Sequence, residues 1–148
     1  MIPQYLNEEH IKAEKEVTKV LEQAWHCKVD HQYKFSSYDC VAHRDNKPLA
    51  FVELRVLNYA WPDLDSIMIS LTKLIAGKQQ TELTKIKSLF VVKWKQSDMI
   101  GWVDVNKLSG KPDFRVTMKG TNRLNDSNEI EVCRYIPVLD FNVIRTWK

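Results

Sequence analysis

The chain has 148 residues, of which 44% are hydrophobic and 28% charged, and its formal net charge is +3. This length predicts a single domain over residues 1–148, with a core that needs no disulfide or structural metal. The composition is typical of a globular protein, and the small positive charge permits nucleic-acid binding without requiring it. No stretch has the length of a membrane span and the N-terminus lacks a secretory segment, so we expect a cytoplasmic protein with no membrane partner.

The cysteine and glycine content excludes several classes of site. The three cysteines are odd in number and far apart, which favours buried free thiols in a reducing compartment over disulfides or a metal knuckle. The four glycines form no phosphate-binding loop, which argues against a nucleotide-driven motor or a kinase.

The first predicted element is a helix that begins at Asn7, a good N-cap, and continues through apolar residues at helical spacing. Those residues are Ala13, Val17, Val20, Leu21 and Ala24. Glu14 lies one turn before Val17, on or beside the apolar face of this helix.

A β-hairpin is expected next. The pattern has period two from Lys28 to Ala42, and the pair Asp45-Asn46 is a turn signal before a buried strand from Leu49 to Val56. Alternation along that strand places Glu53 and Arg55 on one face. With the turn centred at Asp45-Asn46, Asp39 lies roughly opposite Val52 and Glu53.

The remaining elements indicate an α/β layer fold around a mixed sheet. A second helix is expected to open at residues 62–65, to carry an apolar stripe as far as Ile75 and to loosen or end at Gly77 and Lys78. The later elements are a central strand at Leu89–Val92, a turn at Lys95–Asp98, a strand at Met99–Val105, a loop at 120–126 and a β-pair formed by Phe114–Met118 and Ile130–Val138.

The hairpin carries the most informative charges of the chain. Asp39, Glu53 and Arg55 stand on adjacent apolar strands, where a charge is costly unless it is paired or binds a metal. An acid, followed by an acid and a base two residues apart, is the arrangement that metal-dependent phosphodiester cleavage uses. The alternative is a structural ion pair on a solvated sheet face, which stabilises little.

Three local patterns resemble the PD-(D/E)XK nuclease superfamily. The run from Ala13 to Glu22 is similar to the first helix of archaeal Holliday junction resolvases, Tyr38-Asp39 resembles the strand aspartate, and Glu53-Leu54-Arg55 stands where the family has Glu-x-Lys. Further runs resemble a small nuclease-like group often encoded by bacteriophages. They are residues 56–59, 65–73, 90–94, 128–131 and 135–137.

The resemblance implies a restriction-endonuclease-like core in the order αββαββ, followed by a C-terminal β-pair. It also implies a DNA endonuclease in which Asp39 and Glu53 bind Mg²⁺ or Mn²⁺. Glu14 would assist as a further ligand or through water, with Glu16 as a rival for this role. A lysine that recurs on the second helix of the phage group falls at Lys73.

Arg55 departs from the family pattern, because arginine stays protonated and cannot act as a base. Two outcomes follow. Either Lys73 supplies the missing ammonium while Arg55 holds a phosphate, or the site has lapsed and the domain only binds DNA or a protein partner. A protein-interaction module without a nucleic-acid role is a third reading.

Because resolvases of this fold act as dimers, the exposed face of the last β-pair is a candidate dimer interface. In a phage-encoded protein the location would be the host cytoplasm.

Overall fold

The computed structural model describes residues 4–32, 37–61, 63–118 and 130–144. The helices are α1 (Gln4–Trp25) and α2 (Leu71–Thr84), with short 3-10 turns η1 (Lys95–Ser97) and η3 (Val138–Asp140). The strands are β1 (Lys28–His31), β2 (Cys40–Arg44), β3 (Lys47–Leu57), β4 (Ser66–Ser70), β5 (Lys87–Trp94), β6 (Met99–Asp104), β7 (Phe114–Met118), β8 (Ile130–Pro137) and β9 (Asn142–Ile144). None of the helices described is both long and apolar enough to cross a membrane.

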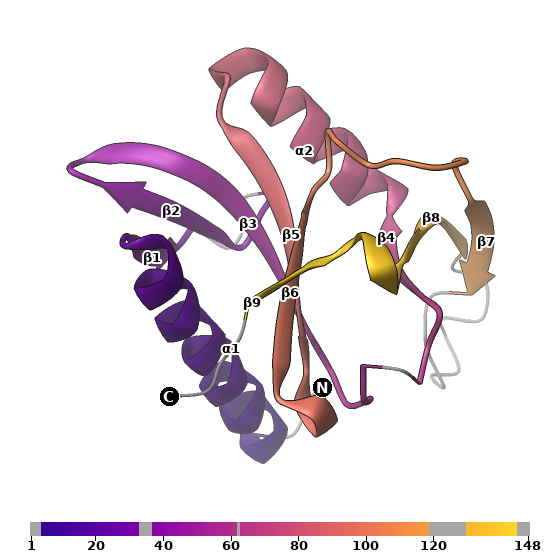
Figure 1. Cartoon of the computed structure of the whole chain (residues 1–148), viewed down its shortest axis with the longest axis horizontal. Coiled ribbons are helices and arrows are strands. Elements are labelled where there is room, and N and C mark those ends of the chain that lie inside the picture. Colours follow the sequence, from indigo (N-terminus) through magenta and orange to yellow (C-terminus); the bar gives the residue numbers. More distant parts are fainter. Residues whose placement is uncertain (1–3, 33–36, 62, 119–129, 145–148) are drawn as a thin grey trace.

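The main layer is a six-stranded sheet in the order β1-β2-β3-β5-β6-β9 (Figure 1). The β3–β5 pair is parallel and the other pairs are antiparallel, which confirms the predicted mixed sheet. The turn between β2 and β3 is where the sequence predicts it, and Asp45 and Asn46 both adopt positive φ, as a two-residue hairpin turn requires. Leu89–Val92 lies in the central strand β5 and is buried.

The two faces of this sheet carry separate apolar clusters. Val17 and Leu21 of α1 pack against Val52 and Leu54 of β3 on one face. The other face packs against α2 through Leu74 and against β4. Because Glu53 and Arg55 alternate with Val52 and Leu54, they project toward the second face. That face is the side on which α2 lies.

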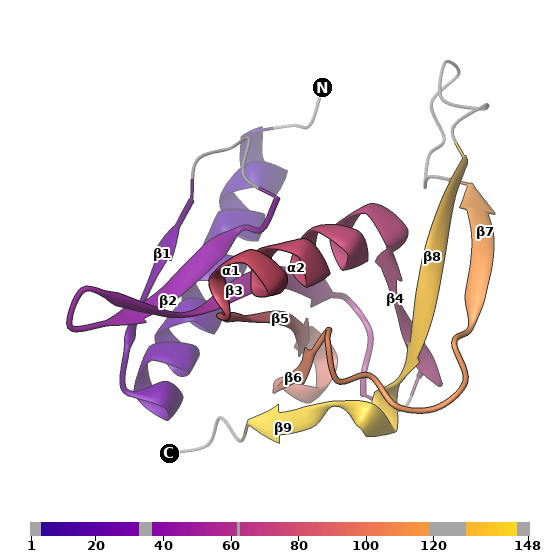
Figure 2. The ribbon, with the colours of Figure 1, turned by 90° about the horizontal axis from the view of Figure 1, so that it is seen from above.

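A second, three-stranded sheet in the order β4-β8-β7 stands beside the main sheet. Figure 2 shows this sheet on one side of α2, with β1, β2 and α1 on the other. The predicted C-terminal β-pair is present as β7 and β8, which pair antiparallel. Its third strand, β4, comes from a segment for which the sequence predicts a helix.

The expectation of a helix opening at residues 62–65 is wrong. Residues 66–70 form β4, which pairs with β8, and the helix begins only at Leu71. Ile67 and Ile69 alternate onto the buried face, so the apolar spacing that resembled a helical stripe is a period-two pattern of β-branched residues. The Ser70 hydroxyl then accepts a hydrogen bond from the Lys73 backbone N–H and caps α2.

Gly77 does not end the second helix, which continues to Thr84. A Cβ atom at Gly77 would lie 2.2 Å from the Tyr38 hydroxyl oxygen and 2.8 Å from a Val105 methyl. Glycine is therefore present here because α2 approaches the strands closely, although this residue weakens a helix.

Three smaller expectations also need correction. The segment predicted as one period-two stretch from Lys28 contains two strands, β1 and β2, which pair as a hairpin. The first helix begins by Gln4, so Asn7 lies within it and is not its N-cap. The main sheet gains an edge strand, β9, that the sequence pattern does not indicate. The predicted loop at 120–126 lies outside the described residues.

Candidate active site

Asp39 and Glu53 are neighbours across the hairpin. Cys40 pairs with Val52, so Asp39, one residue earlier, is next to Glu53 in the antiparallel register. The Leu54 backbone N–H donates to Asp39 Oδ2 at 3.1 Å, which fixes this carboxylate against β3. The hairpin register therefore brings the two predicted acids to one place.

The Glu53 carboxylate is mostly buried, with its side chain 16% exposed. Its pKa is raised to about 7, because burial and the charge of Asp39 together outweigh the opposing effects of Lys73 and Arg55. Glu53 Oε1 lies 3.2 Å from Lys73 Nζ, but among the described residues no donor is aligned with this oxygen as a hydrogen bond. Glu53 and Lys73 are thus close enough to form an ion pair, although they do not form an aligned hydrogen bond.

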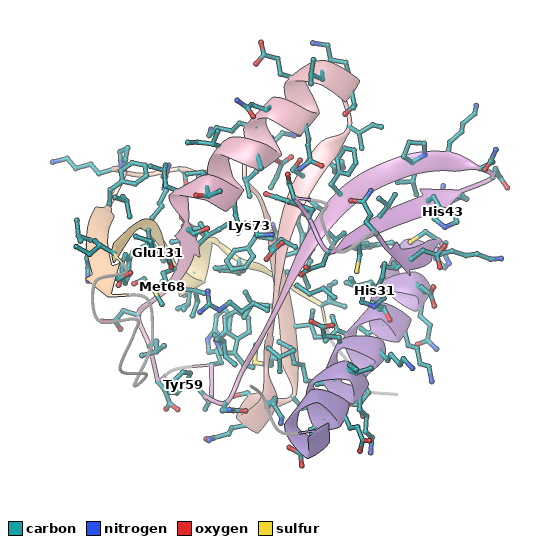
Figure 3. The ribbon with its side chains drawn as sticks, turned by 180° about the vertical axis from the view of Figure 1, so that it is seen from behind. His31, His43, Tyr59, Met68, Lys73 and Glu131 are labelled. Atoms are coloured by element: carbon teal, nitrogen blue, oxygen red, sulfur yellow. The ribbon has the colours of Figure 1, made fainter. Side chains whose placement is uncertain are left out.

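Lys73 is positioned by three contacts, one with the last residue of β4 and two with the segment that precedes β2. Ser70 caps its backbone N–H, the Tyr38 hydroxyl donates to its carbonyl at 3.3 Å, and its ammonium donates to the Ser37 carbonyl. It lies in the middle of the molecule, where the first turn of α2 passes β3 (Figure 3). The lysine that the resemblance singles out therefore meets Glu53.

Arg55 occupies the position of the family lysine and extends toward the second sheet. Its Nη1 donates to the Met68 carbonyl of β4 at 3.3 Å. Its positive charge still lowers the pKa of Glu53, although its effect on this pKa is smaller than that of Lys73. The buried Glu53 carboxylate therefore has two cations near it, Lys73 from α2 and Arg55 from β3.

The two candidate glutamates of α1, Glu14 and Glu16, differ in their surroundings. Glu16 is exposed, whereas Glu14 is half-buried. Burial, together with the negative charges of Asp39, Glu14 and Glu53, raises the pKa of Cys40 to about 12. Glu14 is therefore the helix acid whose charge reaches the same strand as the other two carboxylates.

The residues present fit a divalent metal held by few protein ligands. A buried carboxylate oxygen without an aligned donor, beside a second carboxylate, is satisfied by a cation. Mg²⁺ takes oxygen ligands and keeps several waters, so two carboxylates suffice to hold it. Within the described part of the chain, no group of three or more His, Cys, Asp or Glu residues could hold a metal, so Glu14 is not brought in as a third direct ligand.

Sequence reasoning missed the residues that position Lys73. Tyr38 is 1% exposed and packs beneath α2, yet in the sequence it marks only strand character before Asp39. Ser37 and Ser70 are ordinary small polar residues in the sequence. Ser70 acts locally as the N-cap of α2, whereas the role of Ser37 depends on a contact between segments that are 36 residues apart, which no local pattern reveals.

Comparison with known proteins places the chain in a family. A family model described as "Phage putative PDDEXK endonuclease" matches residues 1–144. The chain belongs to this family. This PDDEXK family is a nuclease family of phages, which agrees with the predicted superfamily.

Among solved structures, the PDDEXK chain is similar to Hjc of Archaeoglobus fulgidus, a Holliday junction resolvase from an archaeal hyperthermophile. The match has 12% sequence identity and a TM-score of 0.49, and it covers 68% of this chain and 78% of Hjc. A comparison with curated proteins gives no significant match.

Proposed function

We propose that this PDDEXK protein is a divalent-metal-dependent DNA endonuclease that hydrolyses phosphodiester bonds. The observation that carries the proposal is the meeting of Asp39, Glu53 and Lys73 at the β2–β3 hairpin and the first turn of α2. Membership of a nuclease family supports the same reaction class. Asp39 and Glu53 would hold Mg²⁺ or Mn²⁺, which supplies Lewis-acid stabilisation of the phosphate and an activated water when bound.

The side chains around the carboxylates have distinct roles in this proposal. Lys73 replaces the ammonium that the Glu-x-Lys pattern lacks here, and its fixed position beside Glu53 lets it orient a water or stabilise developing negative charge. Arg55 holds the phosphate with its planar fork, because a permanently protonated guanidinium cannot accept a proton. Glu14 acts through a bridging water from α1.

A plasmid-nicking assay with Mg²⁺ or Mn²⁺ tests the proposal. Branched DNA should be included as a second substrate, since the sequence does not indicate a preferred DNA shape. We expect the wild-type protein to cut, and Asp39→Asn and Glu53→Gln to lose cleavage by about 10²-fold or more. Cleavage that survives both substitutions would refute the assignment of the two carboxylates.

A second candidate is a nuclease-fold domain that binds DNA or a protein partner without cutting. The observation that favours it is Arg55, which replaces the family lysine and donates to the Met68 carbonyl. Two measurements separate the candidates. Calorimetry with Mn²⁺ would show no binding to a lapsed site, while salt-sensitive DNA binding would persist. If the wild type is inert and Arg55→Lys cuts DNA, the site has lapsed through this residue.

We also propose that the protein forms a homodimer through the exposed part of the face of β7 and β8 that carries Val116 and Ile130. Val116 is 68% exposed and Ile130 is 64% exposed, and Phe114 is exposed on the same strand as Val116. Exposed β-branched residues on one sheet face favour burial against a second copy. A dimeric arrangement would suit a branched substrate with two cleavage positions.

A further inference from the structure

A groove opens beside the candidate active site, between the end of β3 and the three-stranded sheet. It has a volume of about 470 Å³ and is lined by polar, aromatic and apolar side chains. Its lining residues include Arg55, Tyr59, Asp65, Met68, Arg115 and Tyr135. We refer to it as the Arg55 groove.

Arg115 forms a rigid flat surface within this groove. Its guanidinium lies 4.1 Å from the centre of the Tyr135 ring. Its Nε and Nη2 donate to the two carboxylate oxygens of Asp113, at 3.1 and 2.9 Å. The Tyr135 backbone N–H in turn donates to the Asp113 carbonyl at 2.8 Å. The guanidinium plane is thus held in place before any ligand arrives, and its side chain remains 56% exposed.

The chemistry of the groove suits a nucleobase with its phosphate. A guanidinium plane stacked on an aromatic ring offers its outer face to a base, and the exposed Tyr59 ring offers a second stacking surface. Asp113 already neutralises much of the Arg115 charge, so stacking on its plane counts for more here than charge. Asp65 provides a carboxylate acceptor for a base amine. Arg55 provides the cation for the attached phosphate.

The position of the groove connects it to the reaction. Arg55 lies two residues from Glu53 on the same face of β3, about 7 Å along the strand. A nucleotide in the groove would therefore be adjacent to a phosphate at Asp39 and Glu53. A base within a duplex is stacked and cannot enter a concave site, so the occupant must be unpaired or extruded.

We infer that the Arg55 groove binds one unpaired nucleotide of the DNA strand next to the phosphate that is cut. This inference rests on the proposed endonuclease function and narrows its substrate to DNA that contains unpaired nucleotides, as at a flap or a bulge. Met68 and Tyr59, which line the groove, lie on the opposite side of the molecule from His43, which is close to the turn of the β2–β3 hairpin (Figure 3).

Fluorescence anisotropy with two oligonucleotides tests the inference. One is a fully paired duplex, and the other is the same duplex with one unpaired nucleotide. The protein carries Glu53→Gln so that the DNA stays intact, and Mg²⁺ is present. We expect Arg115→Ala and Tyr59→Ala each to weaken binding of the unpaired substrate by about tenfold, and binding of the paired duplex by less than about twofold. Arg115→Lys should behave like Arg115→Ala, because lysine keeps the charge but not the planar surface.

Lys47→Ala is the matched control, since Lys47 is an exposed cation at the far hairpin. It should affect both substrates equally. Equal losses for the two substrates in Arg115→Ala and Tyr59→Ala, or full rescue by Arg115→Lys, would overturn the nucleotide site while leaving the endonuclease proposal intact. Failure of the protein to bind either DNA would overturn both.

Discussion

Lys73 Nζ lies 3.2 Å from Glu53 Oε1, so an ammonium from α2 meets a carboxylate from β3. This contact joins the helix that follows β4 to the hairpin that precedes it. It also places Lys73 beside Glu53, the acid that is followed two residues later by Arg55 and not by the lysine of the Glu-x-Lys pattern.

Replacement of Lys73 should separate its role from that of an ordinary surface lysine. We expect Lys73→Ala to reduce DNA cleavage by about 10²-fold, because a positioned donor at developing charge has an effect of this order. Single-turnover cleavage of a labelled oligonucleotide measures the change.

Lys78→Ala is the control for that experiment, because Lys78 is exposed on the same helix. It should retain nearly full activity. If Lys73→Ala and Lys78→Ala had equal activity, the proposed contribution of the second helix to the reaction would be wrong.

Glu53→Gln should stabilise the metal-free protein above neutral pH. The pKa of Glu53 is raised from 4.5 to about 7, so the folded protein binds this proton more tightly than the unfolded chain does. The resulting contribution to stability is fully present below about pH 4.5 and is lost as the pH rises to about 7. At pH 8 we expect the variant to be more stable by about 1–3 kcal/mol. Urea unfolding at several pH values measures this difference.

Added metal provides the internal check on the Glu53 prediction. Mg²⁺ at pH 8 should raise the Tm of the wild type and should have little effect on Glu53→Gln, because binding to the folded state alone stabilises it. A wild type that is more stable than Glu53→Gln at pH 8 without metal would show that the buried carboxylate is not a source of instability.

Gly77→Ala should destabilise the fold even though alanine favours helices. The new Cβ would lie 2.2 Å from the Tyr38 hydroxyl oxygen and 2.8 Å from a Val105 methyl. Overpacking of this kind costs about 1–3 kcal/mol, which exceeds the gain of about 1 kcal/mol in helix propensity. Thermal unfolding measures the net effect.

A double mutant identifies the clashing atom. Tyr38→Phe removes the hydroxyl, so Gly77→Ala should cost less in a Tyr38→Phe background than in the wild type. An unchanged cost in that background would assign the strain to Val105 instead of Tyr38.

The dimer proposal can be tested at one residue. Val116→Glu should shift the protein from dimer to monomer in size-exclusion chromatography with light scattering, because it places a charge in the apolar face. Leu139→Glu is the control, since Leu139 is 84% exposed on a 3-10 turn outside β7 and β8. A wild type that is monomeric at all concentrations would contradict the proposal.

The sequence predicts the hairpin well because its signals are local. The turn at Asp45-Asn46 predicts Asp39 roughly opposite Val52 and Glu53, and an irregularity in the pairing between Ala42 and His43 sets the register that puts Asp39 next to Glu53. The helix predicted from residue 62 is wrong because the short apolar run Ile67, Met68 and Ile69 is compatible with both helical and strand periodicity. It forms a strand because it pairs with β8.

The remainder of the site depends on contacts between distant segments. Only the family resemblance points to Lys73, because nothing in its surroundings in the sequence distinguishes it from the other lysines. The stack of Arg115 on Tyr135 joins residues that are 20 positions apart on two paired strands, and no local pattern fixes the register of those strands. Burial of Glu53 likewise follows from α2 crossing the sheet.

The most direct test of the account is a crystal soaked in Mn²⁺ and measured for anomalous scattering. We predict a peak between the carboxylates of Asp39 and Glu53, with loss of this peak in Asp39→Asn. A protein that cleaves DNA in the presence of Mn²⁺ but shows its anomalous peak elsewhere, or none between these two residues, would contradict the central claim.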